Sequence, residues 1–391
     1  MDKQYDVLVV GGGPAGCYTA KEAAERGMRV LVVEKDREIG LPVRCAEGVG
    51  DAGLREFFEP DPRWVANEID GFSFFAPDGT QVDLADREIG YVLERRIFDQ
   101  EIGRLAAEAG ARIVTRATAA GMTKEGVFHR VTIRHLGKEV GIEAKIVVGA
   151  DGTESRVGRW AGLRTACSPH DLETGAQYTL AGLKINPRRC QLWFGHDIAP
   201  GGYLWVFPKG AGKANVGLGI SGEFSRDRSP FDYLDRFVAT HFPAASKLGA
   251  VAGAVPCSGG LKRMAADGVL LVGDAAHQVN PLSGGGIINA LKAARIAGRV
   301  AAQAIAEGDV SQKRLAAYES EWMDLLGKSH RRFYRLKEGV FGLSDRTMNR
   351  TAQAVNQLEY EKRTLPRLFR LALFNHPGLL LEIPRLFFAL Q

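Results

Sequence analysis

The sequence has few cysteines and little excess charge of either sign. Its 391 residues include 5 cysteines, and its formal net charge is +5. The cysteines are scattered, with no CxxC pair and no histidine cluster beside them, which argues against a disulfide framework and against a metal site. Cysteines used in this way are typical of a reducing cytosol. The small positive excess gives no reason to expect nucleic acid as a partner.

Long apolar runs are also missing. No uninterrupted apolar stretch reaches about 18 residues, the length that a membrane-spanning helix needs. Residues 1–5 lead directly into a strand pattern and lack the apolar core of a signal peptide, so we expect a cytoplasmic protein. Hydrophobic residues at 45% and charged residues at 25% are ordinary for a globular protein of two or three domains.

The first motif is a glycine-rich turn near the N-terminus. An apolar run at residues 5–10 ends in the pattern G-x-G-x-x-G, and an alanine-rich helical pattern follows. Gly11 permits a tight turn, Gly13 lets the backbone approach a pyrophosphate, and Gly16 allows helix and strand to pack closely. The helix N-terminus offers free N–H groups to phosphate, and Glu34 after the next strand can accept ribose hydroxyls. The segment predicts a dinucleotide site.

The same glycine spacing recurs at Gly217, Gly219 and Gly222, within a stretch of alternating residues. No acidic residue closes a βαβ unit there. We therefore interpret this second pattern as a strand that a ligand or another backbone approaches closely, and not as a nucleotide site.

A second nucleotide-binding segment favours FAD over NAD. Residues 268–273 form a buried-strand pattern followed by Asp274, and glycines 284–286 lead into a long alanine-rich helix. An aspartate at a strand end can hold a hydroxyl of the ribityl chain. The helix N-terminus can stabilise negative charge on the pyrimidine edge of reduced flavin. The alternative is an ordinary helix for which Asp274 is a structural cap.

The order of these patterns predicts an α/β fold (α+β overall) with a discontinuous nucleotide domain. Residues 1–165 and 260–310 form the Rossmann-like FAD-binding domain in this prediction. Short alternating strands punctuated by glycine and proline predict an inserted antiparallel β-rich substrate domain at 166–259. Residues 311–391 are expected to be helical, and parts of 45–95 to contribute to the substrate side.

The residues from Gly11 to Glu34, together with Asp274, resemble the glutathione-reductase-fold flavoproteins of the aromatic-hydroxylase type. Asp151 and the glycines around it are similar to the Asp-Gly motif of that group. The match is partial, because the arginine that ends the motif would fall on Gly158. A second nicotinamide-binding domain is missing, so the resemblance implies an external electron donor, either NAD(P)H that binds transiently or ferredoxin.

Three further segments are residues 42–48 (Pro-Val-Arg-Cys-Ala-Glu-Gly), residues 203–208 (Tyr-Leu-Trp-Val-Phe-Pro) and the pattern Arg95-x-x-Phe98-Asp99. Together they resemble the geranylgeranyl reductase family, most of all its archaeal-type members that act on digeranylgeranyl glycerophospholipids. The resemblance covers roughly residues 1–310. It implies hydrogenation of geranylgeranyl double bonds, in such lipids or in geranylgeranyl diphosphate, by hydride transfer from the flavin and proton delivery.

The same resemblance implies which residues contact FAD, with Arg96 as a rival for the role of Arg95. They are Ala15, Cys45, Ala46, Gly48, Arg95, Ala119, Asp274, Gly286 and Ile287. It also places Cys45 near the flavin ring. Arg44 beside Cys45 favours a reactive thiolate, so Cys45 is one catalytic candidate and Glu47 is another as a proton donor. The alternative for Cys45 is a small buried hydrophobe.

Alternation along residues 203–208 places Tyr203, Trp205 and Phe207 on one face of a strand. Three aromatic side chains in a row can form the wall of an apolar cavity for a prenyl chain. A plain core stripe is the alternative.

The C-terminal region is rich in basic residues interleaved with leucine, phenylalanine and proline. The basic residues are Lys328, Arg331, Arg332, Arg335, Lys337, Arg363, Arg367, Arg370 and Arg385. Basic amphipathic helices can lie on an anionic membrane surface, here the inner face of the cell membrane. A solvated basic helix face is the alternative.

Two other functions remain open on the same fold. An FAD monooxygenase or halogenase is one, although halogenases carry Trp-x-Trp-x-Ile-Pro where this chain begins the segment with Tyr203. A non-catalytic prenyl carrier, similar to the Rab escort and GDP-dissociation-inhibitor proteins, is the other. Those carriers have lost much of the flavin site, whereas Glu34, Asp151 and Asp274 are present here.

Overall fold

The chain forms two units, each assembled from stretches that are far apart in the sequence. The computed structural model describes residues 1–85, 90–226 and 228–374. Unit 1 combines Met1–Val43, Arg95–Ala166 and Ser258–His330, and unit 2 combines Arg44–Glu94, Cys167–Cys257 and the chain from Arg331 onward. The boundaries of the three domains expected from the sequence remain predictions.

Unit 1 contains an eight-stranded sheet in the order β17-β18-β11-β1-β2-β8, with β10 and β9 continuing from β11. Strands β8, β2, β1, β11 and β18 are parallel neighbours, and β9, β10, β11 form an antiparallel meander. Because β1 and β2 are apolar and buried on both faces, they suit the centre of such a sheet. The strands are β1 Gln4–Val10, β2 Val30–Val33, β8 Arg112–Val114, β9 Ala117–Glu125, β10 Phe128–His135, β11 Lys138–Gly149, β17 Ala265–Ala266 and β18 Val269–Leu271.

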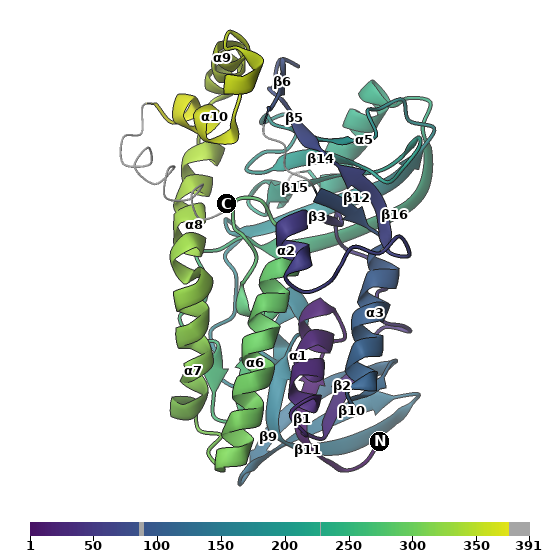
Figure 1. Ribbon diagram of the computed structural model, residues 1–391, viewed down its shortest axis with the longest axis vertical. Helices are drawn as coiled ribbons and strands as arrows, with labels where there is room; N and C mark the ends of the chain where they lie inside the picture. The colour runs from purple at the N-terminus through teal and green to yellow at the C-terminus, as the bar shows by residue number, and fades with distance from the viewer. Residues whose placement is uncertain (86–89, 227, 375–391) are drawn as a thin grey trace. The chain divides into compact units, whose positions relative to one another are not determined.

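Three helices of unit 1 lie side by side, with α1 between α3 and α6 (Figure 1). Gly298 permits the close approach of α6 to α1, because a Cβ there would lie 2.7 Å from the Thr19 carbonyl oxygen. The helices are α1 Pro14–Ala24, α3 Arg95–Glu108, α4 Arg156–Trp160, α6 Ile287–Glu307 and α7 Gln312–Trp322, the last followed by a π-helical turn at Met323–Gly327.

Unit 2 is built on a seven-stranded sheet in the order β16-β12-β15-β14-β13-β5-β6, antiparallel except where β13 pairs with β5. A second sheet has the order β3-β7-β4. The strands are β3 Gly48–Gly50, β4 Val65–Ile69, β5 Gly71–Phe75, β6 Gln81–Asp83, β7 Gly90–Leu93, β12 Leu172–Ala181, β13 Arg189–Trp193, β14 Tyr203–Pro208, β15 Lys213–Ser221 and β16 Ser246–Pro256.

The helices of unit 2 include α5, which covers one face of the large sheet. Leu234, Phe237 and Val238 of α5 share a core with Leu204 and Val206 of β14. The remaining helices are α2 Asp51–Arg55, α8 Lys328–Phe341, α9 Asp345–Asn356 and α10 Leu365–Ala372, and α5 spans Pro230–His241. The predicted α/β fold, with a Rossmann-like parallel sheet, an antiparallel β-rich part and a helical C-terminal region, is confirmed.

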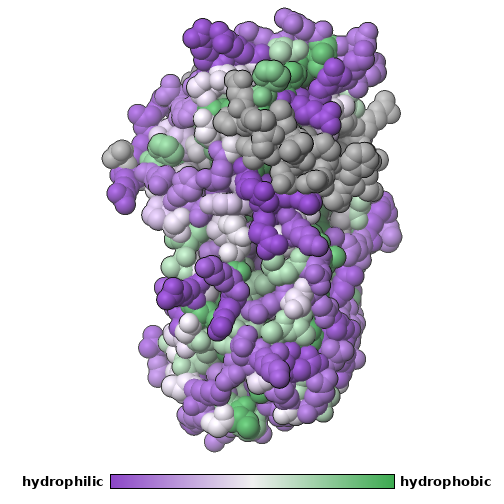
Figure 2. Space-filling view, turned by 90° about the vertical axis from the view of Figure 1, so that its left-hand side faces the viewer, coloured by the Kyte–Doolittle hydropathy of each residue, from purple (hydrophilic) through white to green (hydrophobic). Residues whose placement is uncertain are grey.

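Among the residues that the structure describes, no helix combines the length and the apolar character needed to cross a bilayer. The face drawn in Figure 2 is mostly hydrophilic, with hydrophobic residues gathered in smaller patches.

Candidate functional site

The glycine-rich turn of unit 1 has the geometry of a phosphate cradle. Gly11 has a φ of 108°, and a Cβ at Gly16 would overlap the Gly11 carbonyl oxygen, so the strand and the helix approach each other closely. A Cβ at Gly13, in contrast, would meet nothing within 4 Å. No side chain caps α1 at this end, so its first N–H groups point into that open space. These features fit a pyrophosphate.

Glu34 is fixed beside this turn at the end of β2. Its Oε2 accepts a hydrogen bond from the Gly12 N–H at 2.7 Å, and its Oε1 accepts one from the Asp36 N–H at 2.9 Å. Each carboxylate oxygen retains a lone pair that can accept a ribose hydroxyl. The Ala117 N–H donates to the Glu34 carbonyl oxygen at 2.8 Å, which brings the start of β9, and with it Ala119, to the same place.

Asp274 lies in the second predicted nucleotide segment, just after β18. Burial raises the pKa of its carboxyl group to about 6, against the lowering effect of Arg95. A Cβ at Gly286 would lie 3.7 Å from Asp274 Oδ1, so this carboxyl group is next to the N-terminus of α6, which no side chain caps. A Cβ at Gly273 would lie 3.0 Å from the Ala15 Cβ, and this contact joins the two predicted nucleotide segments.

The partial Asp-Gly motif belongs to the same region of unit 1. Asp151 Oδ2 accepts the Val157 N–H at 2.9 Å, while its buried Oδ1 has no partner among the described residues. Ser155 Oγ donates to the Ala275 carbonyl oxygen at 2.9 Å, which ties the motif to the Gly273 segment. A buried acceptor that lacks a partner, in a segment that adjoins the turn at Gly11, fits a bound ligand that carries donors.

The two rival arginines differ in their surroundings. Arg95 forms a two-pronged ion pair with Asp99, with Nε–Oδ1 at 2.6 Å and Nη2–Oδ2 at 2.8 Å. Arg96 is exposed and pairs with Glu38 at 3.3 Å. The electrostatic effect of Arg95 on Asp274 places it nearer the cradle.

Unit 2 contains the three aromatic side chains of β14, which we call the aromatic row. Tyr203, Trp205 and Phe207 lie on one face of β14, and Leu204 and Val206 fill the fully buried opposite face. The core stripe of this strand is therefore aliphatic, and the aromatic residues are only partly buried.

The Cys45 loop is held against this aromatic face by polar side chains from β12 and β15. Trp205 Nε1 donates to Gln177 Oε1 at 3.0 Å, and Gln177 Nε2 donates to the Cys45 carbonyl oxygen at 3.1 Å. Asn215 Nδ2 donates to the Ala46 carbonyl oxygen at 3.3 Å. The Phe207 ring passes 2.7 Å from where a Cβ at Gly48 would lie, so a larger side chain there would collide with it.

Glu47 is the most tightly held residue of this loop. Its buried Oε2 accepts hydrogen bonds from Lys209 Nζ and Asn215 Nδ2, both at 2.6 Å. The Glu47 N–H donates to Cys45 Sγ at 3.2 Å, and its φ of 73° is unusual for a residue with a side chain. A buried ion pair and a strained backbone therefore fix the position of the Cys45 thiol.

Sequence reasoning missed the three residues that hold this loop, Gln177, Lys209 and Asn215. The sequence shows Gln177 and Asn215 only as polar residues within strands, and Lys209 only as a polar residue just after one, and many such residues are merely exposed. Their partners are more than a hundred positions away in the chain.

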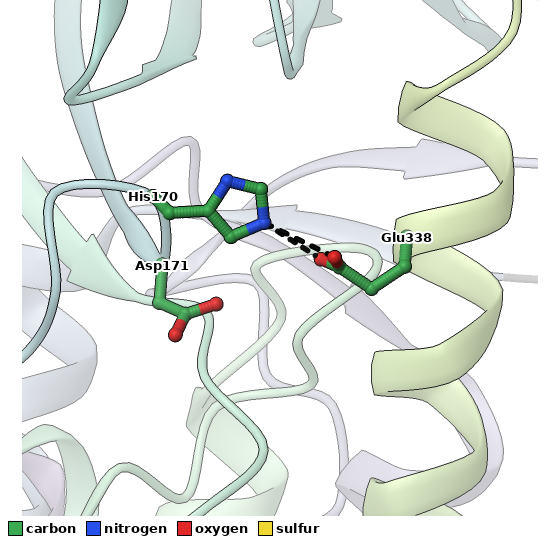
Figure 3. Close-up of side chains that lie close together, drawn as sticks. All are labelled: His170, Asp171 and Glu338. Atoms are coloured by element: carbon green, nitrogen blue, oxygen red, sulfur yellow. Dashed lines mark hydrogen bonds and ion pairs between the residues drawn. The ribbon is translucent and has the colours of Figure 1, made fainter.

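A group of charged side chains in unit 2 lies outside this loop. His170 contacts Glu338 at 3.0 Å (Figure 3). It also contacts Glu223 at 3.2 Å, and the carboxylates of Glu338 and Glu223 raise the pKa of His170. Asp171, drawn beside them, pairs with Lys337 Nζ at 3.0 Å. Since a lysine ammonium already neutralises the carboxylate next to His170, we assign this cluster to ion pairing.

Comparison with known proteins agrees with this geometry. Residues 171–255 match the geranylgeranyl reductase catalytic domain, and residues 6–69 and 258–328 match FAD-binding domains. The chain is 47% identical over 388 residues to the digeranylgeranylglycerophospholipid reductase of Methanocella arvoryzae, covering 98% of this chain and 99% of that protein. This chain belongs to the geranylgeranyl reductase family. The enzyme of the same name from Methanosarcina mazei is 45% identical, with 96% and 94% of the two chains covered.

Solved structures place the fold in the same family. A geranylgeranyl bacteriochlorophyll reductase-like protein of Thermoplasma acidophilum superposes with a TM-score of 0.90 at 36% identity, covering 98% of this chain and 99% of that one. A flavin-dependent brominase has a TM-score of 0.70 at 18% identity, which shows a shared fold alone. The predictions of a geranylgeranyl reductase-family flavoprotein, an FAD-dependent oxidoreductase and FAD as cofactor are confirmed.

Proposed function

We propose that this protein hydrogenates the geranylgeranyl double bonds of prenylated glycerophospholipids with electrons from bound FAD. The observation that carries the proposal is the match of residues 171–255, which hold the aromatic row, to the catalytic domain of geranylgeranyl reductases. The predicted flavin-dependent reduction of geranylgeranyl lipids is confirmed at that level by the family. We propose specifically that the substrate carries a glycerophospholipid head group. Geranylgeranyl diphosphate is the other substrate to test.

FAD supplies the hydride, and the residues of unit 1 hold the cofactor. The turn from Gly11 to Gly16 and the N-terminus of α1 would bind the pyrophosphate, and Glu34 would bind the ribose. Asp274 would hold the ribityl chain, and the N-terminus of α6 would favour negative charge on the flavin ring. The direct contacts to FAD of Ala15, Arg95, Ala119, Gly286 and Ile287, and those of Cys45, Ala46 and Gly48 in unit 2, stay predictions.

The residues of unit 2 bind and orient the prenyl chain. Tyr203, Trp205 and Phe207 offer aromatic surface to an apolar chain and exclude water from the double bond. Cys45 lies where the loop meets this surface, and we assign it contact with the reacting alkene. Glu47, which is paired with a cation, positions that thiol, and its predicted part as a proton donor stays a prediction.

The test is anaerobic incubation of dithionite-reduced holoenzyme with digeranylgeranyl glycerophospholipid, followed by mass spectrometry of the lipid. We expect the lipid to gain the mass of two hydrogens for each double bond reduced. A parallel sample with geranylgeranyl diphosphate distinguishes the two substrates. The proposal fails if the lipid binds and the flavin is reduced but no mass is gained by either substrate. Repeating the assay with NADPH, and with reduced ferredoxin, in place of dithionite identifies the electron donor.

The C-terminal helices support a peripheral contact with an anionic membrane. Arg367 and Arg370 of α10 are exposed, and Leu371 and Phe374 beside them are 36% and 74% exposed. Basic and apolar side chains together on one short helix, and on the turn that follows it, suit the interface of a bilayer. Lys337 does not belong to this basic surface, because it is buried. Arg385, another basic residue for which the sequence predicts a membrane contact, lies outside the described residues.

Charge reversal tests this membrane contact. Each basic residue near an anionic surface contributes about 1 kcal/mol, so the double variant Arg367→Glu/Arg370→Glu is expected to lower partitioning onto phosphatidylglycerol vesicles by about 30-fold or more. Sedimentation with the vesicles measures it. The matched control is Arg130→Glu/Arg134→Glu on the exposed side of β10, which makes the same change of net charge. Equal losses in the two variants would contradict a specific contact through α10.

A further inference from the structure

A buried carboxyl group without a partner lies at the start of β12. Glu173 is 9% exposed, and neither of its carboxyl oxygens has a hydrogen-bond partner among the described residues. Burial raises the pKa of this group to about 8, against the lowering effect of Lys337 and His170 and with a smaller raising effect of Asp171. Glu173 is therefore an uncharged carboxylic acid at neutral pH, able to donate a proton.

The surrounding cations are engaged elsewhere. Lys337 Nζ donates to Asp171 Oδ1 and to the Cys257 carbonyl oxygen, both at 3.0 Å. His170 contacts Glu223 and Glu338. A buried polar group without partners destabilises the fold. The Glu173 carboxyl group at this position is therefore explained by a role in function and not by stability.

The sheet register places Glu173 on the same face as the aromatic row. Tyr203 of β14 lies opposite Gly219 of β15, and Gly219 lies opposite Gly175 of β12. Glu173 precedes Gly175 by two residues and therefore has its side chain on that face. Along the same face of β12, Gln177 contacts Trp205. Glu173, Tyr203 and Trp205 thus share one surface of unit 2.

Glycines at the neighbouring positions let the carboxyl group extend toward Tyr203. A Cβ at Gly219 would lie 3.6 Å from Glu173 Oε2, and a Cβ at Gly202 would lie 3.0 Å from the same oxygen. Burial raises the pKa of the Tyr203 hydroxyl, and the acidic groups near it include Glu173 and Cys45. The carboxyl group and the Cys45 thiol therefore both lie near Tyr203.

We propose that Glu173 is the acid that protonates the alkene in this reduction, a role that rests on the proposed function. The less substituted alkene carbon takes the proton as the Glu173 O–H bond breaks, and the more substituted carbon takes the hydride. The two-electron oxidation of reduced flavin balances the reduction of the alkene, and the Glu173 carboxylate regains a proton from water. Positive charge that develops on the substituted carbon is stabilised by aromatic ring faces, which Tyr203 and Trp205 provide.

The variant Glu173→Gln keeps the shape of the side chain and removes the acidic proton. We expect the rate at which prenyl lipid reoxidises the prereduced enzyme to fall by about 10²–10⁴-fold, with FAD content and lipid binding unchanged. In the wild-type enzyme that rate is expected to fall as pH rises through about 8, as the Glu173 proton is lost. The variant should lack this pH dependence, which a merely structural residue would not control.

Infrared spectroscopy gives a second readout that does not depend on turnover. The wild-type protein is expected to show a carboxylic-acid C=O band that disappears as pH rises through about 8, and the Glu173→Gln variant should lack the band. The control Glu223→Gln changes an exposed glutamate of the same unit and should keep both the band and the rate.

Two outcomes separate the role of Glu173 from the proposed function. If the wild-type enzyme reduces prenyl lipid while Glu173→Gln keeps the wild-type rate and pH profile, the role of Glu173 is overturned and the function stands. If the wild-type enzyme reduces no prenyl lipid, the function fails and the role fails with it.

Discussion

The variant Gly16→Ala is expected to purify without flavin. A Cβ at this position would overlap the Gly11 carbonyl oxygen and lie 3.1 Å from the Ala150 Cβ, so α1 has to move away from β1. Such a shift displaces the N–H groups at the start of α1 from the pyrophosphate. Overpacking of this kind costs about 1–3 kcal/mol in the free energy of unfolding. Flavin absorbance measures the first effect, and urea unfolding of the apoprotein measures the second.

Gly13→Ala is the matched control, because a Cβ there meets no protein atom within 4 Å. Its methyl group would occupy the space assigned to the pyrophosphate. We therefore expect the apoprotein to keep its wild-type stability while the affinity for FAD falls. If Gly13→Ala binds FAD like the wild type, the cradle at this turn does not hold the phosphate.

The variant Lys209→Met is expected to destabilise unit 2 and release the Cys45 loop. Lys209 Nζ lies 2.6 Å from Glu47 Oε2 and 3.0 Å from Glu94 Oε2, and the side chains of Lys209 and Glu47 are 6% and 5% exposed. Removing one partner of a buried ion pair leaves an uncompensated charge, which costs about 3–5 kcal/mol. Urea unfolding measures this cost. The rate at which Cys45 reacts with a thiol reagent should rise, because Glu47 no longer anchors the loop.

Two comparisons define the cause of that effect. The double variant Lys209→Met/Glu47→Gln removes both charges and is expected to recover part of the lost stability. Lys213→Met removes an ammonium group that lies 3.5 Å from Glu94, and the Lys213 side chain is 37% exposed. This change should lower the free energy of unfolding by less than about 1 kcal/mol. Equal destabilisation by Lys209→Met and Lys213→Met would contradict a special role for the buried pair.

The cofactor side of this protein could be predicted from short stretches of sequence. The turn at Gly11 to Gly16 and the strand end at Asp274 are local arrangements, because close backbone approach needs glycine and phosphate needs a helix N-terminus. The spacing of the motifs also predicted that the nucleotide domain is discontinuous and surrounds a β-rich insert. The structure added that Gly273 packs on Ala15, which joins two motifs more than two hundred residues apart.

The substrate side depended on the pairing of strands. Alternation alone placed Tyr203, Trp205 and Phe207 on one face of a strand, but it left open whether that face was core. The structure shows that Leu204 and Val206 are the buried side. Which side of a strand is buried depends on the helix that covers the sheet, here α5, and no local pattern in β14 specifies that helix.

By itself, the sequence determined the identity of the cofactor and the family, because glycine spacing and strand-end carboxylates act within a few residues of chain. Only the tertiary structure decided how the chemistry of unit 2 is arranged. Glu173, Gln177 and Asn215 look like ordinary polar residues in strands until the register brings them to one face. Burial raises the pKa of the Glu173 carboxyl group and so favours its protonated form. Asn215, together with Lys209, instead holds the Glu47 carboxylate in place.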